Sequence, residues 1–152
     1  MSVIIEREDI RIRVAGIYIE NDKILLVKHQ KNDREYYLLP GGGQHTGEKA
    51  PDALIREWKE ELSIDIVPGE FLFLGESIPP EINSRKHVYQ MVYSVTKISG
   101  NIFVHTDNTL VGCAWVDLQE LPNLTLYPLC MDQILAYINK QHPAPYCTYT
   151  WG

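Results

Sequence analysis

Three glutamates close together in the sequence are the residues best suited to chemistry. Glu57, Glu60 and Glu61 are spaced i, i+3 and i+4, so on a helix they share one face. Like charges this close repel one another. A hard divalent cation would stabilise them, because magnesium takes carboxylate and carbonyl oxygens as ligands. The alternative is an acidic face that is solvated by water and balanced by Arg56 and Lys59.

A glycine-rich segment precedes these glutamates. Pro40 is followed by three glycines, Gly41 to Gly43. Proline lacks the backbone donor, and glycine adopts backbone angles that are closed to other residues. We therefore predict a turn that cannot continue a strand. Such a turn offers backbone carbonyls to a cation and lets a phosphate approach closely.

The element that must position the glutamates is a helix, which we predict over Lys49–Leu62. Pro51 stands in its first turn, where a missing N–H costs little. At about 100° per residue, the apolar side chains fall on one side, which is expected to pack on a core. These side chains are Ala50, Leu54, Ile55, Trp58 and Leu62.

The segment from Leu39 to Ile64 resembles the Nudix box, the signature of a large hydrolase family. The family pattern is Gx5Ex7RE, a hydrophobe, xEExG and a hydrophobe. The matching residues here are Gly42, Glu48, Arg56, Glu57, Trp58, Glu60, Glu61 and Ile64, with Ser63 in place of the last glycine. That glycine ends the helix in a left-handed conformation. We therefore expect Ser63 to cost a little stability and to leave the chemistry intact.

The resemblance implies hydrolysis of a nucleoside diphosphate linked to another moiety, with water attacking a phosphorus of the pyrophosphate. It implies that Glu57, Glu60 and Glu61 bind the metal and provide the base, although which of them takes the proton is left open. It further implies that the Gly41 carbonyl is a backbone ligand and that the metal is Mg2+ or Mn2+. Arg56 is expected to orient one carboxylate through a charge-assisted hydrogen bond.

Five further residues are candidates for contact with the substrate. Glu48 suits the positive end of the helix dipole, and it either orients the site or binds metal indirectly. Gly42 and Gly43 are expected to lie against a phosphate. Tyr37 is a candidate for stacking on a base, and His87 for contacting a phosphate or a base. The alternatives are packing within a strand for Tyr37 and a solvent-facing or strand-end position for His87.

The remaining chain is predicted to consist of strands with one more helix. We expect a hairpin of strands 11–19 and 23–28, a polar loop at 31–34, and strands at 36–39, 71–78, 87–95 and 114–118, with a turn at 68–69, an extended segment at 101–105 and a helix at 129–139. Loops are expected at 79–85 and at 106–112. The second loop holds Asp107, a candidate for the acidic residue that some Nudix relatives supply late in the chain. This order fits an α/β (α+β) domain with a mixed sheet, and the resemblance implies the Nudix α/β/α sandwich.

Composition bounds the domain count and the partners. The chain has 152 residues and a net charge of −6 without a basic run. The length suits a single domain over 1–152, and the charge argues against duplex nucleic acid or an anionic membrane as the main partner. No apolar run approaches membrane-spanning length. The three cysteines Cys113, Cys130 and Cys147 fit no zinc pattern and favour a reducing compartment, so we expect a cytoplasmic protein.

The aromatic C-terminal tail, residues 142–152, is predicted to pack on its own domain or on a second subunit of a homodimer. Two functions are carried forward. The first is a metal-dependent pyrophosphohydrolase of a small nucleotide, which the intact carboxylate set favours. The second is a non-catalytic Nudix-fold module that binds or senses a nucleotide.

The substrate class has one clue in the sequence. Pro79-Pro80 lies about fifteen residues beyond the box, which resembles the proline of ADP-ribose pyrophosphatases. This spacing favours ADP-ribose-like compounds slightly over nucleoside triphosphates. The alternative is that the two prolines simply stop the strand that ends at Ile78.

Overall fold

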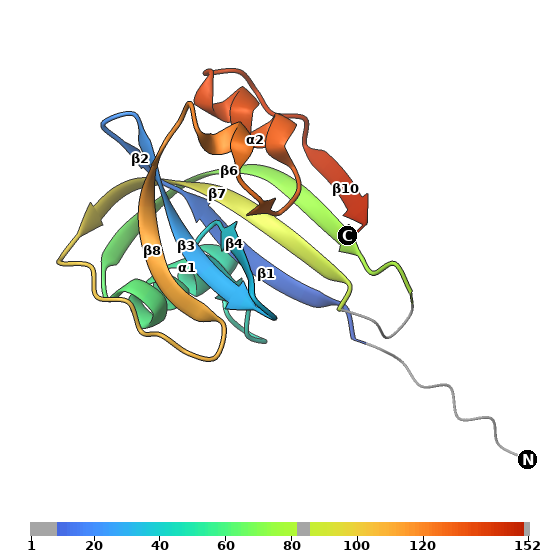
Figure 1. Ribbon diagram of the computed structural model, residues 1–152, viewed down its shortest axis with the longest axis horizontal. Helices are drawn as coiled ribbons and strands as arrows, with labels where there is room; N and C mark the ends of the chain where they lie inside the picture. The colour runs from blue at the N-terminus through green and yellow to red at the C-terminus, as the bar shows by residue number, and fades with distance from the viewer. Residues whose placement is uncertain (1–8, 82–85, 151–152) are drawn as a thin grey trace, which may run out of the picture.

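The computed structural model of the protein describes residues 9–81 and 86–150. The strands are β1 (Arg11–Ile17), β2 (Ile19–Glu20), β3 (Lys23–Lys31), β4 (Arg34–Leu38), β5 (Gly41–Gly43), β6 (Asp65–Ile78), β7 (Val88–Ser99), β8 (Leu110–Asp117), β9 (Leu126–Tyr127) and β10 (Tyr146–Thr150). The helices are α1 (Ala50–Leu62), the short 3-10 helix η1 (Leu121–Asn123) and α2 (Met131–Ile138). Figure 1 shows α1 and α2 well apart, with strands between them.

The described strands form two sheets. The first has the order β10-β6-β7-β1-β5; β10 is parallel to β6 and β1 is parallel to β7, while the other neighbours are antiparallel. In the second, β3 is antiparallel to β2, β4 and β8, and β9 runs parallel to β4. The first sheet is therefore mixed, as the sequence predicted.

Two apolar cores lie on opposite faces of these strands. On β3, Leu25 and Val27 pack in the core of α1, whereas Ile24 and Leu26 pack in the core of α2. Successive side chains of a strand point to opposite faces, so this alternation places the strands between the two helices. The predicted α/β class and its α/β/α sandwich are confirmed.

Tight turns join the strands of the second sheet. Asn21 and Asp22, between β2 and β3, have φ of 53° and 59°. Asn32 and Asp33, between β3 and β4, have φ of 52° and 61°. Positive φ at both central residues gives the twist that a two-residue hairpin needs, and asparagine and aspartate tolerate it best after glycine. The first hairpin is as predicted, and the predicted polar loop at 31–34 is only a two-residue turn.

The prediction for the three glycines was wrong, because they form a strand. Gly41–Gly43 make β5, which pairs antiparallel with β1. A Cβ on Gly41 would overlap the Val14 carbonyl, and a Cβ on Gly42 would overlap the Glu57 carboxylate. The missing side chains therefore let this backbone lie directly between β1 and α1. Two residues, Leu39 and Pro40, separate β5 from β4.

The prediction of a turn at 68–69 was wrong. Pro68-Gly69 is not a turn: β6 continues through it, with irregularities in its pairing to β7 from Val67 onward. Residues 101–105, predicted to be extended, form no strand; the Phe103 and His105 N–H groups donate to carbonyls of the last turn of α1. Within the predicted loop at 79–85, residues 82–85 lie outside the described part of the chain.

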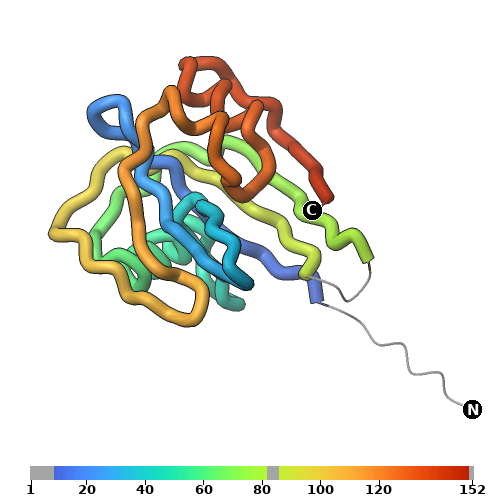
Figure 2. The backbone as a smooth tube through the Cα atoms, viewed as in Figure 1, coloured from blue at the N-terminus to red at the C-terminus, as the bar shows by residue number. Residues whose placement is uncertain are grey.

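The C-terminal tail packs on its own chain through β10, which lies beside β6 in Figure 2. A disulfide joins Cys130, just before α2, to Cys147 in β10. The spacing of the cysteines did not predict this pair, so the argument from cysteines to a reducing compartment loses its support. Trp151 of the predicted tail lies outside the described residues. No helix in the described ranges is long and apolar enough to cross a membrane.

Candidate functional site

The amphipathic pattern of α1 turns its carboxylates toward a cavity. Ala50, Ala53, Leu54, Trp58 and Leu62 are buried in the core. This anchoring brings Glu57, Glu60 and Glu61 to the wall of a cavity of about 890 Å3, together with all three glycines of β5. The three glutamates and the glycines that the sequence predicted as a site thus line one cavity.

Arg56 connects the acidic residues to the glycine strand. Its Nε and Nη2 donate to the two carboxylate oxygens of Glu48, at 2.8 and 3.0 Å. Nη1 donates to Glu57 Oε1 at 2.8 Å and more weakly to Glu60 at 3.3 Å. Nη2 also reaches the Gly43 carbonyl at 2.8 Å. A planar fork of donors can hold several oxygens in fixed directions, so Arg56 orients Glu57 from behind.

Glu48 is the partner that fixes Arg56 in turn. Hydrogen bonds from Arg56, and then from the His45 N–H, lower the pKa of Glu48 to about 2. The same bond to Glu48 raises the pKa of Arg56, so both groups stay charged. Glu48 does not line the cavity. Its contacts are those of a residue that orients the site, as one of the two sequence interpretations held.

Glu61 is in the opposite electrostatic situation. Burial raises the pKa of this carboxyl to about 7, and the attraction of Arg13 opposes this only in part. Its Oε1 accepts the Gly41 N–H at 3.2 Å. Among the described residues, no cation lies within salt-bridge distance of Glu61. A buried carboxylate without a close counter-charge is costly, so this position favours binding of a cation.

These residues fit a divalent metal ion. Glu57 and Glu61 offer hard carboxylate oxygens, and the Gly41 carbonyl lies beside them on β5. No three acidic, histidine or cysteine side chains in the described ranges already converge as ligands. Arg56 bonds Glu57 and Glu60, and the Gly41 N–H bonds Glu61. A bound divalent ion would neutralise phosphate charge and make a bound water more acidic. The side chains of the chain itself would hold and orient it.

The cavity also carries positive charge. Arg11 and Arg13 come from β1, and Lys31 and Arg34 flank the turn between β3 and β4; all four line the cavity. The sequence has no basic run, so these cations gather only through the fold. A substrate with several negative charges would meet them opposite or beside the metal ligands.

Aromatic side chains from the second sheet complete the lining. His29 stacks on Tyr36 with ring centroids 5.5 Å apart, and Tyr36 meets Tyr127 edge to face at 5.7 Å. All three line the cavity. Tyr37, the predicted base-stacking residue, instead packs against the core of α2. The strand's alternation places its neighbour Tyr36 at the cavity.

Two predicted residues take up structural contacts. His87 lies 2.6 Å from Glu76 Oε2 and does not line the cavity, although the next residue, Val88, does. Asp107 lines the cavity, but its Oδ1 accepts the Leu110 and Thr109 N–H groups, which lower the pKa of Asp107. The structure therefore gives Asp107 a loop-fixing role. His105 from the same segment is a cavity residue that the sequence interpretation missed.

Arg13 and His29 are two further cavity residues that the sequence interpretation missed. Arg13 sits in the run Arg11-Ile12-Arg13-Val14, where a basic residue interrupts a β-branched strand. That alternation was a usable signal for an inward-facing charge. No comparable pattern in the sequence singled out His29, which lies on β3 where the pairing with β8 is irregular between Lys28 and His29.

Comparisons with known proteins agree with this geometry. A family model described as the NUDIX domain matches residues 10–138. An ADP-ribose pyrophosphatase of Methanocaldococcus jannaschii is 32% identical over 114 residues, which cover 74% of this chain and 65% of that protein. The matched stretch therefore spans just under two thirds of that relative.

Solved structures show the same fold. The MutT NUDIX hydrolase of Burkholderia pseudomallei superposes with a TM-score of 0.65 at 25% identity, covering 74% of this chain and 86% of that one. The MutT mutator protein of Bacillus halodurans superposes with a TM-score of 0.73 at 17% identity, covering 93% and 90%.

Proposed function

We propose that the protein is a metal-dependent pyrophosphohydrolase of small nucleotides. The chain belongs to the NUDIX domain family, and this membership is the first support for the proposal. The observation that carries this proposal is one cavity with two kinds of charge. Glu57 and Glu61 offer metal ligands, while Arg11, Lys31 and Arg34 offer positive charge to a polyanion. Phosphoryl transfer asks mainly for charge neutralisation and alignment of the attacking water, and this lining supplies both.

The contacts support the following roles for the residues of the site. Glu57, Glu60, Glu61 and the Gly41 carbonyl bind Mg2+ or Mn2+. Arg56, held by Glu48, keeps Glu57 oriented. Glu60 is 58% exposed at its side chain and is held only at 3.3 Å, so it is the proposed ligand that the metal-free chain holds least firmly.

For the substrate, we propose a nucleoside diphosphate linked to another moiety, with ADP-ribose-like compounds ahead of nucleoside triphosphates. The relative named as an ADP-ribose pyrophosphatase supports this ranking. Pro79-Pro80 adds little, because both residues directly follow the end of β6, where they would also serve to stop a strand. A homodimer and a cytoplasmic location stay predictions.

The test is a panel of kcat/KM values with Mg2+, with Mn2+ and with a chelator. The panel holds ADP-ribose, other nucleotide sugars, ordinary and oxidised nucleoside triphosphates, and dinucleoside polyphosphates. We expect ADP-ribose to be preferred and the chelator to abolish turnover. A preference of about a hundredfold for a triphosphate, near 2.7 kcal/mol, would overturn the substrate ranking. Equal rates with chelator would overturn the metal dependence. Tight nucleotide binding without turnover of any compound would favour the sensing module instead.

A further inference from the structure

Arg13 is a charged residue on a face that is otherwise core. Ala15 and Ile17, which follow it at alternate positions of β1, are fully buried in the core of α2. Strand alternation directs Arg13 to the same face, where it is half-buried and opens onto the cavity. Burial lowers the pKa of Arg13, against the attraction of Glu61. A guanidinium in such a place must be well bonded to be tolerated.

Its partners are the backbone carbonyls that lead into the glycine strand. Nη2 of Arg13 donates to the Leu39 carbonyl at 3.0 Å and to the Gly41 carbonyl at 3.2 Å. One nitrogen therefore joins the two carbonyls on either side of Pro40. Nη1 donates to Gln90 Oε1 on β7 at 3.0 Å. These bonds tie the end of β4, the start of β5 and the centre of the first sheet together.

The rest of this backbone step is held equally firmly. The Pro40 carbonyl accepts the Trp58 indole N–H at 2.9 Å and the Gly16 N–H at 3.0 Å. The Gly41 N–H donates to Glu61. Three consecutive carbonyls, those of residues 39, 40 and 41, thus have donors from β1 and α1. Of these three, the Gly41 carbonyl is the one that lies next to the acidic ligands.

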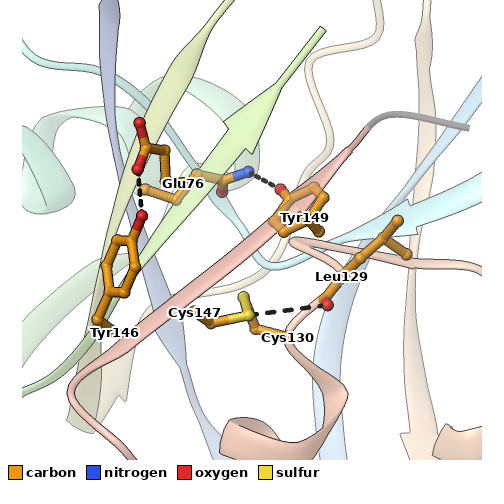
Figure 3. Close-up of a disulfide and its surroundings, with 7 residues drawn as sticks. Glu76, Leu129, Cys130, Tyr146, Cys147 and Tyr149 are labelled. Carbon is orange, nitrogen blue, oxygen red and sulfur yellow. Dashed lines mark hydrogen bonds between the residues drawn. A yellow bond between two sulfur atoms is a disulfide. The ribbon is translucent and has the colours of Figure 1, made fainter. Parts of the chain in front are cut away.

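Gln90 holds the Arg13 guanidinium through the bond to its Oε1. Its side chain is only 1% exposed, and its Nε2 donates to the Tyr149 hydroxyl at 3.2 Å. Tyr149 lies on β10, two residues after the disulfide cysteine Cys147, and Figure 3 draws a hydrogen bond that ends at its hydroxyl oxygen. A buried amide with partners on both sides has a single orientation, so it fixes the direction of the Arg13 guanidinium.

We propose that Arg13, braced by Gln90, is a positioning residue that aims the Gly41 carbonyl at the divalent cation. The inference rests on the proposed function, which makes that carbonyl a ligand. A carbonyl oxygen has two lone pairs, so it accepts the Arg13 bond and still offers a lone pair to a metal. Hydrogen-bonding partners of metal ligands typically contribute 10–100-fold to metal affinity.

Two other roles for Arg13 predict different changes in metal affinity when Arg13 is removed. If it were only a positive charge beside the site, removing it would relieve repulsion and tighten binding of a cation. If it contacted a substrate phosphate, its loss would raise KM and leave the affinity for the metal alone the same or tighter. A positioning role alone predicts weaker binding of the metal without any nucleotide.

The experiment measures Mn2+ affinity by titration calorimetry on the nucleotide-free full chain, with thermal melts and ADP-ribose kinetics on the same samples. The variants are Arg13→Met, Arg13→Lys and Gln90→Met. Arg11→Met is the matched control, because it removes the same charge from the same strand and the same cavity, but makes no bond to the carbonyls of residues 39–41.

We expect Arg13→Met to weaken Mn2+ binding about tenfold or more and to lower kcat, with KM for ADP-ribose changing less than about threefold. The Mn2+ affinity of Arg13→Lys should lie between those of Arg13→Met and the unmodified chain, because an ammonium does not reproduce the fork of a guanidinium. Gln90→Met should weaken binding in the same direction. Arg11→Met should bind Mn2+ as tightly as the unmodified chain or more tightly.

Unchanged or tighter Mn2+ binding in Arg13→Met and Gln90→Met would overturn the inference, and a raised KM alone would assign Arg13 to the phosphate. If Arg13→Met does not fold, Arg13→Lys and Gln90→Met decide the question. A chain that binds Mn2+ but cleaves no compound of the panel would end the proposed function and leave the positioning role standing. An active chain whose Arg13 variants bind Mn2+ normally would end only the inference.

Discussion

At the scale of single residues, the site keeps two carboxylates paired and leaves a third without a close counter-charge. Arg56 holds Glu48 and Glu57 at 2.8 Å, so their charges are compensated. Burial raises the pKa of Glu61 to about 7, and in the chain alone its charge is a liability. The charged form of Glu61 would serve to bind a metal but destabilises the metal-free fold. Such perturbed groups are typical of functional sites.

Glu61→Gln should remove activity while sparing stability. A raised carboxyl pKa means that folding is favoured by the protonated form, so this contribution is lost as pH rises from about 4.3 toward 7. Glutamine keeps the acceptor for the Gly41 N–H and cannot ionise. In chelator at pH 8, we expect an equal or higher melting temperature. With Mg2+ in place of the chelator, we expect kcat to fall by a hundredfold or more, near 2.7 kcal/mol.

The control for this prediction is Glu70→Gln, which changes an exposed glutamate that does not line the cavity. It should leave both the melting temperature and kcat unchanged. A clear drop in the melting temperature of Glu61→Gln at pH 8 would show that the Glu61 charge is stabilised in the metal-free chain.

Glu48 should control stability on the acid side. Its pKa is lowered to about 2, so its contribution is fully present above about pH 4.3, the value for an unfolded chain, and is lost as pH falls toward 2. Glu48→Gln should be less stable at pH 7 and should show a shallower loss of stability between pH 5 and pH 2.5. Urea midpoints across that range, with Glu70→Gln in parallel, measure the effect; parallel curves for Glu48→Gln and the unmodified chain would contradict it.

At the scale of elements, the site depends on how closely β5 approaches α1. Gly42 lies where any side chain would overlap the Glu57 carboxylate, whereas a Cβ on Gly43 would meet nothing nearer than Arg11 Nη2 at 3.3 Å. The end of a flexible arginine moves cheaply, but a carboxylate held by Arg56 does not.

Gly42→Ala and Gly43→Ala therefore form a matched pair. We expect Gly42→Ala to displace Glu57 and to lower kcat by about tenfold or more, because misplaced catalytic groups are costly. Gly43→Ala should stay within about threefold of the unmodified kcat. Circular dichroism and kinetics on both proteins decide; equal activities would mean that β5 can move away from α1 without consequence.

A non-glycine residue, Ser63, occupies the left-handed position at the end of α1. Ser63 is left-handed, with φ of 62°, as the resemblance to the Nudix box led us to expect. The structure adds what the motif omits: Ser63 Oγ bonds the Phe103 carbonyl at 3.1 Å and His105 Nε2 at 2.6 Å. The serine thus offsets the strain of its backbone by fastening residues 103–105 to the helix.

Ser63→Ala should cost about 1 kcal/mol, because it loses these bonds and keeps the strain. Ser63→Gly loses the same bonds but relieves the strain, so its unfolding free energy should lie within about 0.5 kcal/mol of the unmodified chain. Urea denaturation of the two variants gives both numbers. A glycine variant less stable than the alanine variant would refute the left-handed assignment.

Period and motif explain what could be predicted from the sequence. Helix α1 was predictable within one residue because its apolar residues recur at helical spacing around Leu54 and Trp58. The spacing of residues in the Nudix box located the glutamates on this helix. Strand β5 was not predictable, because glycine carries no alternation and only its contact with β1 reveals it. The basic lining was not predictable either, since Lys31 and Arg34 join Arg11 only through the pairing of separate strands.

At the scale of the whole molecule, the C-terminal segment closes the first sheet. β10 pairs with β6 through its whole length, and Cys130–Cys147 fastens it to the start of α2. Its Tyr149 reaches Gln90, and through it Arg13. The last described strand is thus linked to the glycine strand by consecutive hydrogen bonds across the sheet.

Reduction of this disulfide should therefore lower stability more than activity. The bond joins residues separated by 17 positions, and closing a loop of that size restricts the unfolded chain by about 3 kcal/mol in the chain-entropy model. We expect a dithiol reductant to lower the unfolding free energy by about that amount.

Cys147→Ser should be as unstable as the reduced chain and should not respond to the reductant, while Cys113→Ser, at the free cysteine, should respond normally. Thiol titration of the denatured, non-reduced protein should find one free thiol; three thiols would show that the pair is not bonded in solution. Because β6 still pairs with β10 in the reduced chain, kcat at 25 °C should fall by no more than a few-fold, and a complete loss would mean that the covalent bond itself holds Tyr149 against Gln90.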